Sequence, residues 1–218
     1  MLVKLAADNR TLKQIRSNER KADKKRELLP FYLPWVAGVL ANGKCAQDDI
    51  VMTVMLWRLD ADDIAGALEI ARYAMTWGLT MPTGRRPTPY LLAEEVALAA
   101  QRLLAAKQPV ELANLLDTIA LTERADMPDI VRAKLHKITG YVLRDASQLP
   151  EALAHLQRAI QLERTIGVKK DIEQLERQLR PKPEPAPKTK TTKPRTRKPA
   201  AKPAARRGRP PKAAKAAG

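Results

Sequence analysis

Cysteine and long apolar runs are scarce in this sequence. Cys45 is the single cysteine among 218 residues, which excludes an internal disulfide and a thiolate zinc site. An apolar run such as IVMTVMLW (residues 50–57) is too short to span a membrane, and the N-terminal MLVKLAADNR lacks the apolar core of a secretory signal. We therefore expect a soluble, intracellular protein.

Acidic and large apolar residues are nearly absent from residues 181–218. This segment contains thirteen Lys or Arg residues, one acid (Glu184) and nine of the 17 prolines, and it has no Leu, Ile, Val or aromatic residue. Residues 1–180 are nearly balanced, with 27 basic and 23 acidic residues. The segment cannot bury enough apolar surface to offset its chain entropy, so we expect a disordered basic tail whose partner is a polyanion.

The tail contains RRGRPPK (residues 206–212), which resembles the core of an AT-hook. A glycine lets the backbone lie deep in a minor groove, and the flanking arginines would follow the floor of a narrow A·T tract. The alternative is a polycationic tail that binds DNA by charge alone; both interpretations predict DNA affinity. The candidate DNA-binding residues of the tail are Arg206, Arg207, Gly208, Arg209, Pro210 and Lys212.

Residues 1–180 are rich in Ala, Leu, Glu, Arg and Gln and lack alternating Val-rich runs, which predicts an all-α fold. The first helix should run from Leu2 to Leu28, after which Pro30 and Pro34 should interrupt the helical structure. The expected later helices span about 35–40, 47–59, 60–78, 90–106, 109–122, 128–145, 150–166 and 169–180.

The first helix combines a thin apolar stripe, formed by Leu5, Leu12 and Ile15, with an excess of basic residues that could follow a phosphate backbone. The alternative is a solvated face that its four acidic residues partly balance. The candidate DNA-binding residues of this helix are Lys13, Arg16, Arg20 and Lys24.

A helix hairpin is predicted near the end of the body. Gly140, Ala152, Leu156 and Ala159 match the small and apolar contact positions of a tetratricopeptide hairpin, and residues 64–74 repeat part of the pattern. No clean 34-residue period is present, so we expect an irregular array of helical hairpins that is only partly tetratricopeptide-like.

Candidate catalytic groups are few. The only dense acidic group should cap helix N-termini rather than hold a metal ion; its members are Asp48, Asp49, Asp60, Asp62 and Asp63. His136 and His155 should face each other in the hairpin, with no evident third ligand. Since no Ser-His-Asp pattern and no P-loop is present, we assign no catalytic residue, no metal and no cofactor.

Five runs of sequence together resemble the small terminase subunit of temperate, contractile-tailed bacteriophages. They are MLVKLAADNRTLK, KKRELLPFYLPWVAGVL, QDDIVMTVMLWRLDADDIAGALEIARYA, GLTMP and ADMPDIVRAKLHKITG, and the resemblance covers nearly all of residues 1–180. It implies a DNA-packaging protein of the host cytoplasm that binds the packaging-initiation site of viral double-stranded DNA. The implied protein partners are the large terminase subunit, which carries the ATPase, and further copies of the chain in a homo-oligomeric ring.

The resemblance leaves two alternatives open. The family is often labelled an endonuclease subunit, so the chain itself could cut the packaging site; the other alternative is a helical interaction scaffold with non-specific DNA affinity. Relatives usually extend upstream of the position matching Met1, so either the native start lies upstream or part of the recognition region is missing. We divide the chain into a DNA-recognition and assembly segment (1–34), a helical body (35–180) and the basic tail (181–218).

Overall fold

The described residues of this computed structural model are 1–43, 46–82 and 86–180, and within them all regular secondary structure is helical, as predicted. The candidate tail residues and Cys45 lie outside these ranges. The helices are α1 (Leu2–Gln14), α2 (Asn18–Asn42), α3 (Asp49–Asp60), α4 (Ile64–Thr76), α5 (Thr88–Ala105), α6 (Leu112–Thr122), α7 (Asp129–Asp145), α8 (Leu149–Leu162) and α9 (Lys169–Leu179).

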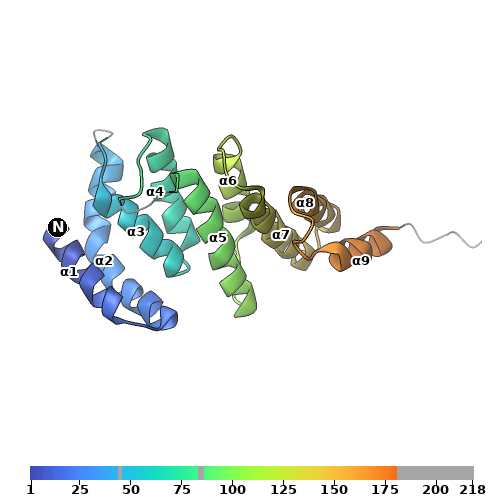
Figure 1. Cartoon of the computed structure of the whole chain (residues 1–218), viewed down its shortest axis with the longest axis horizontal. Coiled ribbons are helices and arrows are strands. Elements are labelled where there is room, and N and C mark those ends of the chain that lie inside the picture. Colours follow the sequence, from blue (N-terminus) through green and yellow to red (C-terminus); the bar gives the residue numbers. More distant parts are fainter. Residues whose placement is uncertain (44–45, 83–85, 181–218) are drawn as a thin grey trace, which may run out of the picture. The chain divides into compact units, whose positions relative to one another are not determined.

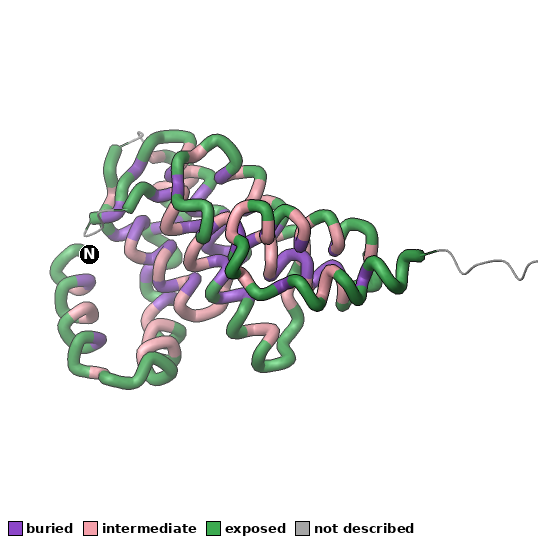
Figure 2. Tube along the Cα trace, turned by 45° about the vertical axis from the view of Figure 1, so that its right-hand side comes forward, coloured by how far each residue is buried: buried purple, intermediate pink, exposed green. Residues whose placement is uncertain are grey.

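The helices of residues 1–180 pack mainly on their neighbours in the sequence, as Figure 1 shows. One apolar core joins α1 to α7, and a second, smaller core lies among α7, α8 and α9. Buried segments follow the inner faces of the helices (Figure 2). No helix in the described ranges is both long enough and apolar enough to cross a lipid bilayer.

The prediction of one long N-terminal helix was wrong. The chain leaves the helix at Ile15, whose backbone is extended, and α2 starts after Ser17, whose side chain accepts a hydrogen bond from the backbone N–H of Arg20. The break lets Leu5 and Leu12 of α1 join the core instead of pointing away from α2. Serine is a strong N-cap residue, so Ser17 was the signal in the sequence that marked this start.

The prediction that Pro30 and Pro34 break the chain was also wrong, because both lie inside α2. A proline in a helix interior removes one backbone hydrogen bond and costs about 3 kcal/mol. Both prolines lie on the exposed side of the helix, where water can reach the carbonyls that lose their partners. The opposite face buries Leu29, Tyr32 and Val36, and this burial offsets the cost.

Three helices end with a non-glycine residue in the left-handed conformation. Asp62, Lys107 and Ser147 have φ values of 65°, 56° and 62°. In each case the following N–H bonds to a carbonyl five residues earlier, for example Asp63 N–H to Arg58 O at 2.8 Å. This pattern closes the C-termini of α3, α5 and α7 and sets the direction of the chain into the next helix.

The α7–α8 hairpin forms around Gly140, as predicted. A Cβ atom built on Gly140 would lie 2.6 Å from Leu156 Cδ2 and 3.3 Å from the carbonyl oxygen of Ala152. A residue with a side chain would force Leu156 or α8 itself to shift, so the glycine allows the close approach of the two helices. Whether the whole array is tetratricopeptide-like stays a prediction.

The two histidines face each other across this hairpin, as predicted. His136 Nδ1 lies 3.1 Å from His155 Nδ1, and the ring centroids are 5.1 Å apart. Burial, the neighbouring His155 and the cations of Arg158 and Arg132 lower the pKa of His136 to about 4. Burial also lowers the pKa of His155. The pair is therefore neutral at pH 7, with one ring N–H donating to the other ring.

The histidine pair predicts acid sensitivity of the hairpin. Because the pKa of His136 falls from 6.5 to about 4 on folding, the unfolded chain binds more protons between these pH values. We expect the free energy of unfolding to drop by roughly 1–2 kcal/mol between pH 7 and pH 5 on this account, the half-buried ring being partly screened by water. Urea unfolding at both pH values measures the drop.

A variant with both His136→Gln and His155→Gln is the control, since the chain has no other histidine. Its stability should change much less between pH 7 and pH 5. An equal loss in this variant and in the wild type would show that other groups cause the acid sensitivity.

Candidate nucleic-acid interface

Residues 13–20, where α1 ends and α2 begins, form what we call the basic corner. Lys13, Arg16 and Arg20 lie on this short segment, and their side chains are exposed. Ser17 caps α2 within the corner and gives the connection a defined backbone path. The three cations thus project from a bend between two helices rather than from one long helical face.

A buried tyrosine attaches α1 to α2. Tyr32 is completely buried, packs edge-on against Trp57, and donates its hydroxyl hydrogen to Asp8 at 2.5 Å. Burial and the hydrogen bond to Asp8 raise the pKa of Tyr32, so its hydroxyl stays protonated and keeps donating. Lys4 pairs with the same carboxylate at 3.0 Å. Together with the buried Leu5 and Leu12, this contact sets the position of the basic corner.

Ion pairing divides the basic residues of α1 and α2 into two groups. Lys24 pairs with Glu27 at 2.7 Å, and Arg26 pairs with Asp23 at 2.7 Å. In contrast, no ion pair within the described ranges involves Arg10, Lys13, Arg16, Arg20 or Lys21. An ion-paired cation must exchange a carboxylate for a phosphate, so the second group is better suited to contact a nucleic acid backbone.

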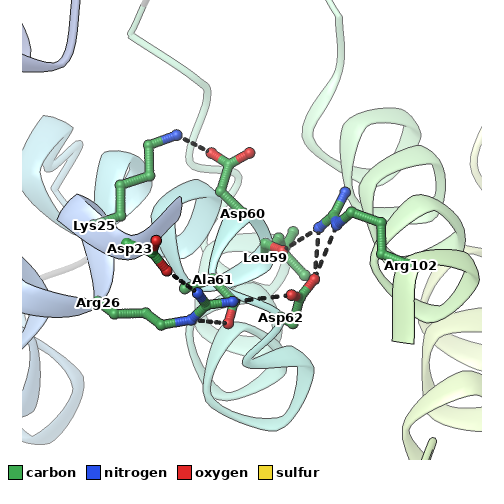
Figure 3. Close-up of polar contacts among 8 residues, drawn as sticks. All are labelled: Asp23, Lys25, Arg26, Leu59, Asp60, Ala61, Asp62 and Arg102. Carbon is green, nitrogen blue, oxygen red and sulfur yellow. Dashed lines mark hydrogen bonds and ion pairs between the residues drawn. The ribbon is translucent and has the colours of Figure 1, made fainter. Parts of the chain in front are cut away.

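The base of the N-terminal helix pair is held by one carboxylate (Figure 3). Asp62 accepts from Arg26 of α2 at 3.1 Å and from Arg102 of α5 at 2.9 Å. The same two guanidinium groups also donate to backbone carbonyls, Arg26 to Ala61 of the α3–α4 turn at 3.3 Å and Arg102 to Leu59 in the last turn of α3 at 2.8 Å. We call this group the Asp62 clamp; it joins α2, the α3–α4 turn and α5.

A second ion pair lies beside the clamp. Lys25 of α2, which is largely buried, pairs with Asp60 at the end of α3. Burial, followed by the charges of Asp60 and Glu94, raises the pKa of Glu95 on α5. The prediction that Asp60 and Asp62 cap a helix N-terminus was therefore wrong, because both carboxylates neutralise cations of other helices.

Asp48 and Asp63 do cap helix N-termini, as predicted. Asp48 Oδ1 accepts from the N–H groups of Ile50 and Val51 at 2.9 Å each, and its other oxygen accepts from Trp35 Nε1 at 3.0 Å. Asp63 accepts from the N–H of Gly66 at 2.9 Å and pairs with Arg58 at 2.7 Å. One oxygen of each carboxylate caps a helix and the other binds Trp35 or Arg58, which leaves both aspartates poorly placed to ligate a cation.

Within residues 1–43, 46–82 and 86–180, no three His, Cys, Asp or Glu side chains converge in a way that could hold a metal ion. The arrangement of this region is instead that of a basic corner with exposed cations on a rigid helical base.

The family model described as phage small terminase subunit matches residues 2–130. The chain belongs to the phage small terminase subunit family. It is 65% identical over 215 residues to the "Terminase, endonuclease subunit" of Escherichia phage P2, covering 98% of this chain and 86% of that protein. It is 27% identical over 188 residues to the "Probable terminase, endonuclease subunit" of Haemophilus phage HP1, covering 78% and 66%. No solved structure matches.

Sequence reasoning found part of this small terminase subunit's candidate interface. Lys13, Arg16 and Arg20 lie together at the corner, whereas Lys24 is half-buried and ion-paired. Sequence reasoning did not select Arg10 and Lys21, which also form no ion pair within the described ranges. It also missed the Asp62 clamp, for which no local signal exists, because its members come from α2, the α3–α4 turn and α5.

The Asp62 clamp predicts a measurable stability loss. Asp62→Asn keeps a residue that tolerates the left-handed conformation but removes the charge shared by two guanidinium groups. We expect the free energy of unfolding to fall by about 1–2 kcal/mol in urea titrations at low salt, and by less at 0.5 M NaCl.

The matched control is Asp117→Asn, which removes one exposed ion pair with Arg72 and should cost at most about 0.5 kcal/mol. Equal losses in the two variants would mean that the clamp is no more than a surface ion pair.

Proposed function

We propose that this small terminase subunit binds the packaging-initiation region of concatemeric viral DNA in the host cytoplasm. It then presents the bound DNA to the large ATPase subunit for cleavage and translocation into the procapsid. The observation that carries the DNA-binding part is the set of exposed cations at the basic corner, within the segment that the family model matches. Phosphate contacts made by such cations position a protein on a duplex and provide much of its affinity.

The clamp supports this assignment because it separates structural cations from available ones. Lys25, Arg26 and Arg102 are neutralised by carboxylates and hold helices together. Lys13, Arg16 and Arg20 have no ion pair in the described part of the chain and project from the corner. DNA can therefore meet the corner without dismantling the base of the helix pair.

The tail supplies a second DNA contact in this proposal. Arg207 and Arg209 would enter an A·T-rich minor groove, Gly208 would let the backbone approach its floor, and Pro210 would keep the chain extended. Arg206 and Lys212 would meet the flanking phosphates. Residues 1–34 then serve recognition and assembly, residues 35–180 form the body, and residues 181–218 act as a tethered electrostatic arm.

A homo-oligomeric ring completes the proposal. Several basic corners and tails on one ring would engage one duplex together, and tethering raises the effective concentration of each further contact. The array of helix pairs, whose tetratricopeptide-like character is part of this proposal, provides the side surfaces through which neighbouring copies would pack.

The corner can be tested by charge reversal. The variant Lys13→Glu, Arg16→Glu, Arg20→Glu should bind phage DNA more weakly, and the slope of log affinity against log salt should decrease by roughly 0.9 for each phosphate that the variant no longer neutralises. The matched control reverses Arg124, Arg164 and Arg177, three exposed arginines of the body. Fluorescence anisotropy over a salt series, with footprinting across the packaging start, measures both.

Equal slopes for these two variants would remove the corner from the DNA interface. The tail is tested in the same series, since Gly208→Glu should reduce the preference for A·T-rich duplex more than Lys190→Glu if the minor-groove interpretation holds. If the chain binds the large subunit but protects no site on phage DNA in footprints, it is an interaction scaffold instead.

Intrinsic cleavage is a second candidate function, and the name of the phage P2 relative is the observation that favours it. A nuclease that uses metal ions needs carboxylates converging on one or two cations. In the described ranges Asp48 and Asp63 bind backbone N–H groups, and Asp63 also binds Arg58, whereas Asp49 accepts from the side-chain amide of Gln47. We therefore assign cleavage to the assembled terminase rather than to this chain.

This assignment predicts that the purified chain does not cut DNA in the presence of Mg²⁺. It also predicts that Asp48→Asn with Asp49→Asn leaves cleavage by the reconstituted terminase largely intact, since Asn also caps helices well and the stability cost is a few tenths of a kcal/mol to about 1 kcal/mol. Gel assays of DNA carrying the packaging site measure both. Site-specific cleavage by the isolated chain that the paired substitution abolishes without unfolding would make the chain itself the endonuclease.

A further inference from the structure

A groove of about 580 Å³ lies between α5 and α7, with Ile166 of the α8–α9 connection contributing to its wall. Its lining includes Ala97 and Ile138, which are nearly fully buried, and Leu98, which is 37% exposed. An exposed leucine above a buried apolar floor marks a surface that a partner can cover with a gain in hydrophobic burial.

Basic side chains of α7 line this groove, the first two about one helical turn apart and the third about two turns further on. Lys134, Lys137 and Arg144 extend over about 15 Å of the helix, from a rise of 1.5 Å per residue. Lys134 is exposed and forms no ion pair within the described ranges. Lys137 donates one hydrogen to the carbonyl of Ile166 at 2.8 Å, which leaves two ammonium hydrogens for a ligand.

The acidic groups near the groove are already engaged. Asp145 and Asp171 pair with Arg144 at 3.2 Å and 3.3 Å, and Tyr141 donates its hydroxyl hydrogen to Asp171 at 3.2 Å. These contacts neutralise Arg144 but leave the charges of Lys134 and Lys137 uncompensated by a carboxylate in the described part of the chain. The groove therefore combines an apolar floor with a basic rim.

We propose that the α5–α7 groove binds an acidic, amphipathic helical segment of the large terminase subunit. Carboxylates spaced one turn apart on such a helix would meet the ammonium groups of Lys134 and Lys137, while its apolar face would cover Leu98. Laying an amphipathic helix into a groove is a common mode of peptide recognition. The choice of the large subunit as the partner rests on the proposed function, whereas the chemistry of the segment rests on the groove.

Charge and apolarity select this occupant over others. The chain's own tail has thirteen basic residues and one acid, so a basic rim repels it. A duplex could meet the rim with phosphates but would leave the apolar floor uncovered. The family model ends at residue 130, so the basic rim on α7 lies beyond the matched segment. The basic corner and the Asp62 clamp, in contrast, lie within that segment.

The test compares charge reversal at the rim with charge reversal elsewhere. The full-length variant Lys134→Glu, Lys137→Glu should bind the purified large subunit of the same phage about tenfold more weakly or worse, because close charge pairs at interfaces couple strongly. The matched control is Arg164→Glu, Arg177→Glu, which makes the same charge change at exposed sites outside the groove lining. Leu98→Ser changes the α5 side of the groove and should weaken binding of the large subunit as well. Because this variant is independent of the α7 variant, misfolding of one of them cannot decide the result.

A photo-crosslinker in place of Gln101, which is exposed and lines the groove, identifies the occupant. The proposal expects a crosslink to a segment of the large subunit that carries Asp or Glu at one-turn spacing. Crosslinks only to DNA or to a second copy of the chain would overturn it, as would equal affinity of rim and control variants for the large subunit. Footprints test the proposed function independently of the groove. If the rim variant still protects the packaging start but binds the large subunit as tightly as the control does, the groove inference fails and the proposed DNA binding stands.

Discussion

The charge of Asp62, which lies in the α3–α4 turn, connects α2 and α5 through residues far from it in the sequence. Its carboxylate accepts from guanidinium groups of α2 and α5, and these groups also donate to backbone carbonyls at the end of α3 and in the α3–α4 turn. The backbone of Asp62 is left-handed because it closes the C-terminus of α3, so the same residue ends one helix and joins two others. Together with the burial of Leu29, Tyr32 and Val36, this arrangement places α2 on the body.

The clamp gives the basic residues of this small terminase subunit different roles. Cations that reach a carboxylate of another helix stabilise the fold, and their charge is screened from a ligand. Cations on the corner between α1 and α2 have no such partner in the described ranges and lie on an exposed bend. The amino-acid composition does not distinguish these basic residues, whereas their neighbours in the structure decide which of them can contact a polyanion.

Burial on one face decides the structure of the N-terminal segment more than local propensity does. Leu29, Tyr32 and Val36 keep α2 helical through two prolines, and Leu5 and Leu12 favour a break that returns α1 to the core. At Pro30 local propensity predicts the opposite, a helix break, whereas at residues 15–17 the N-cap Ser17 acts in the same direction as the burial of Leu5 and Leu12. Packing of an amphipathic face outweighs the helix-breaking effect of Pro30 because each apolar side chain contributes roughly 1.5–3 kcal/mol on burial.

The sequence by itself determined the helical class, the two main capping aspartates, the close approach of α7 and α8 at Gly140, and the resemblance to small terminase subunits. Each of these depends on residues near one another in the chain or on a recognisable run. The tertiary structure decided that Asp60 and Asp62 hold other helices, that Lys24 is paired while Lys21 is not within the described residues, and that α5 and α7 enclose a basic, apolar groove. These features join residues separated by tens of positions, and their partners are set by packing, for which a local pattern has no signal.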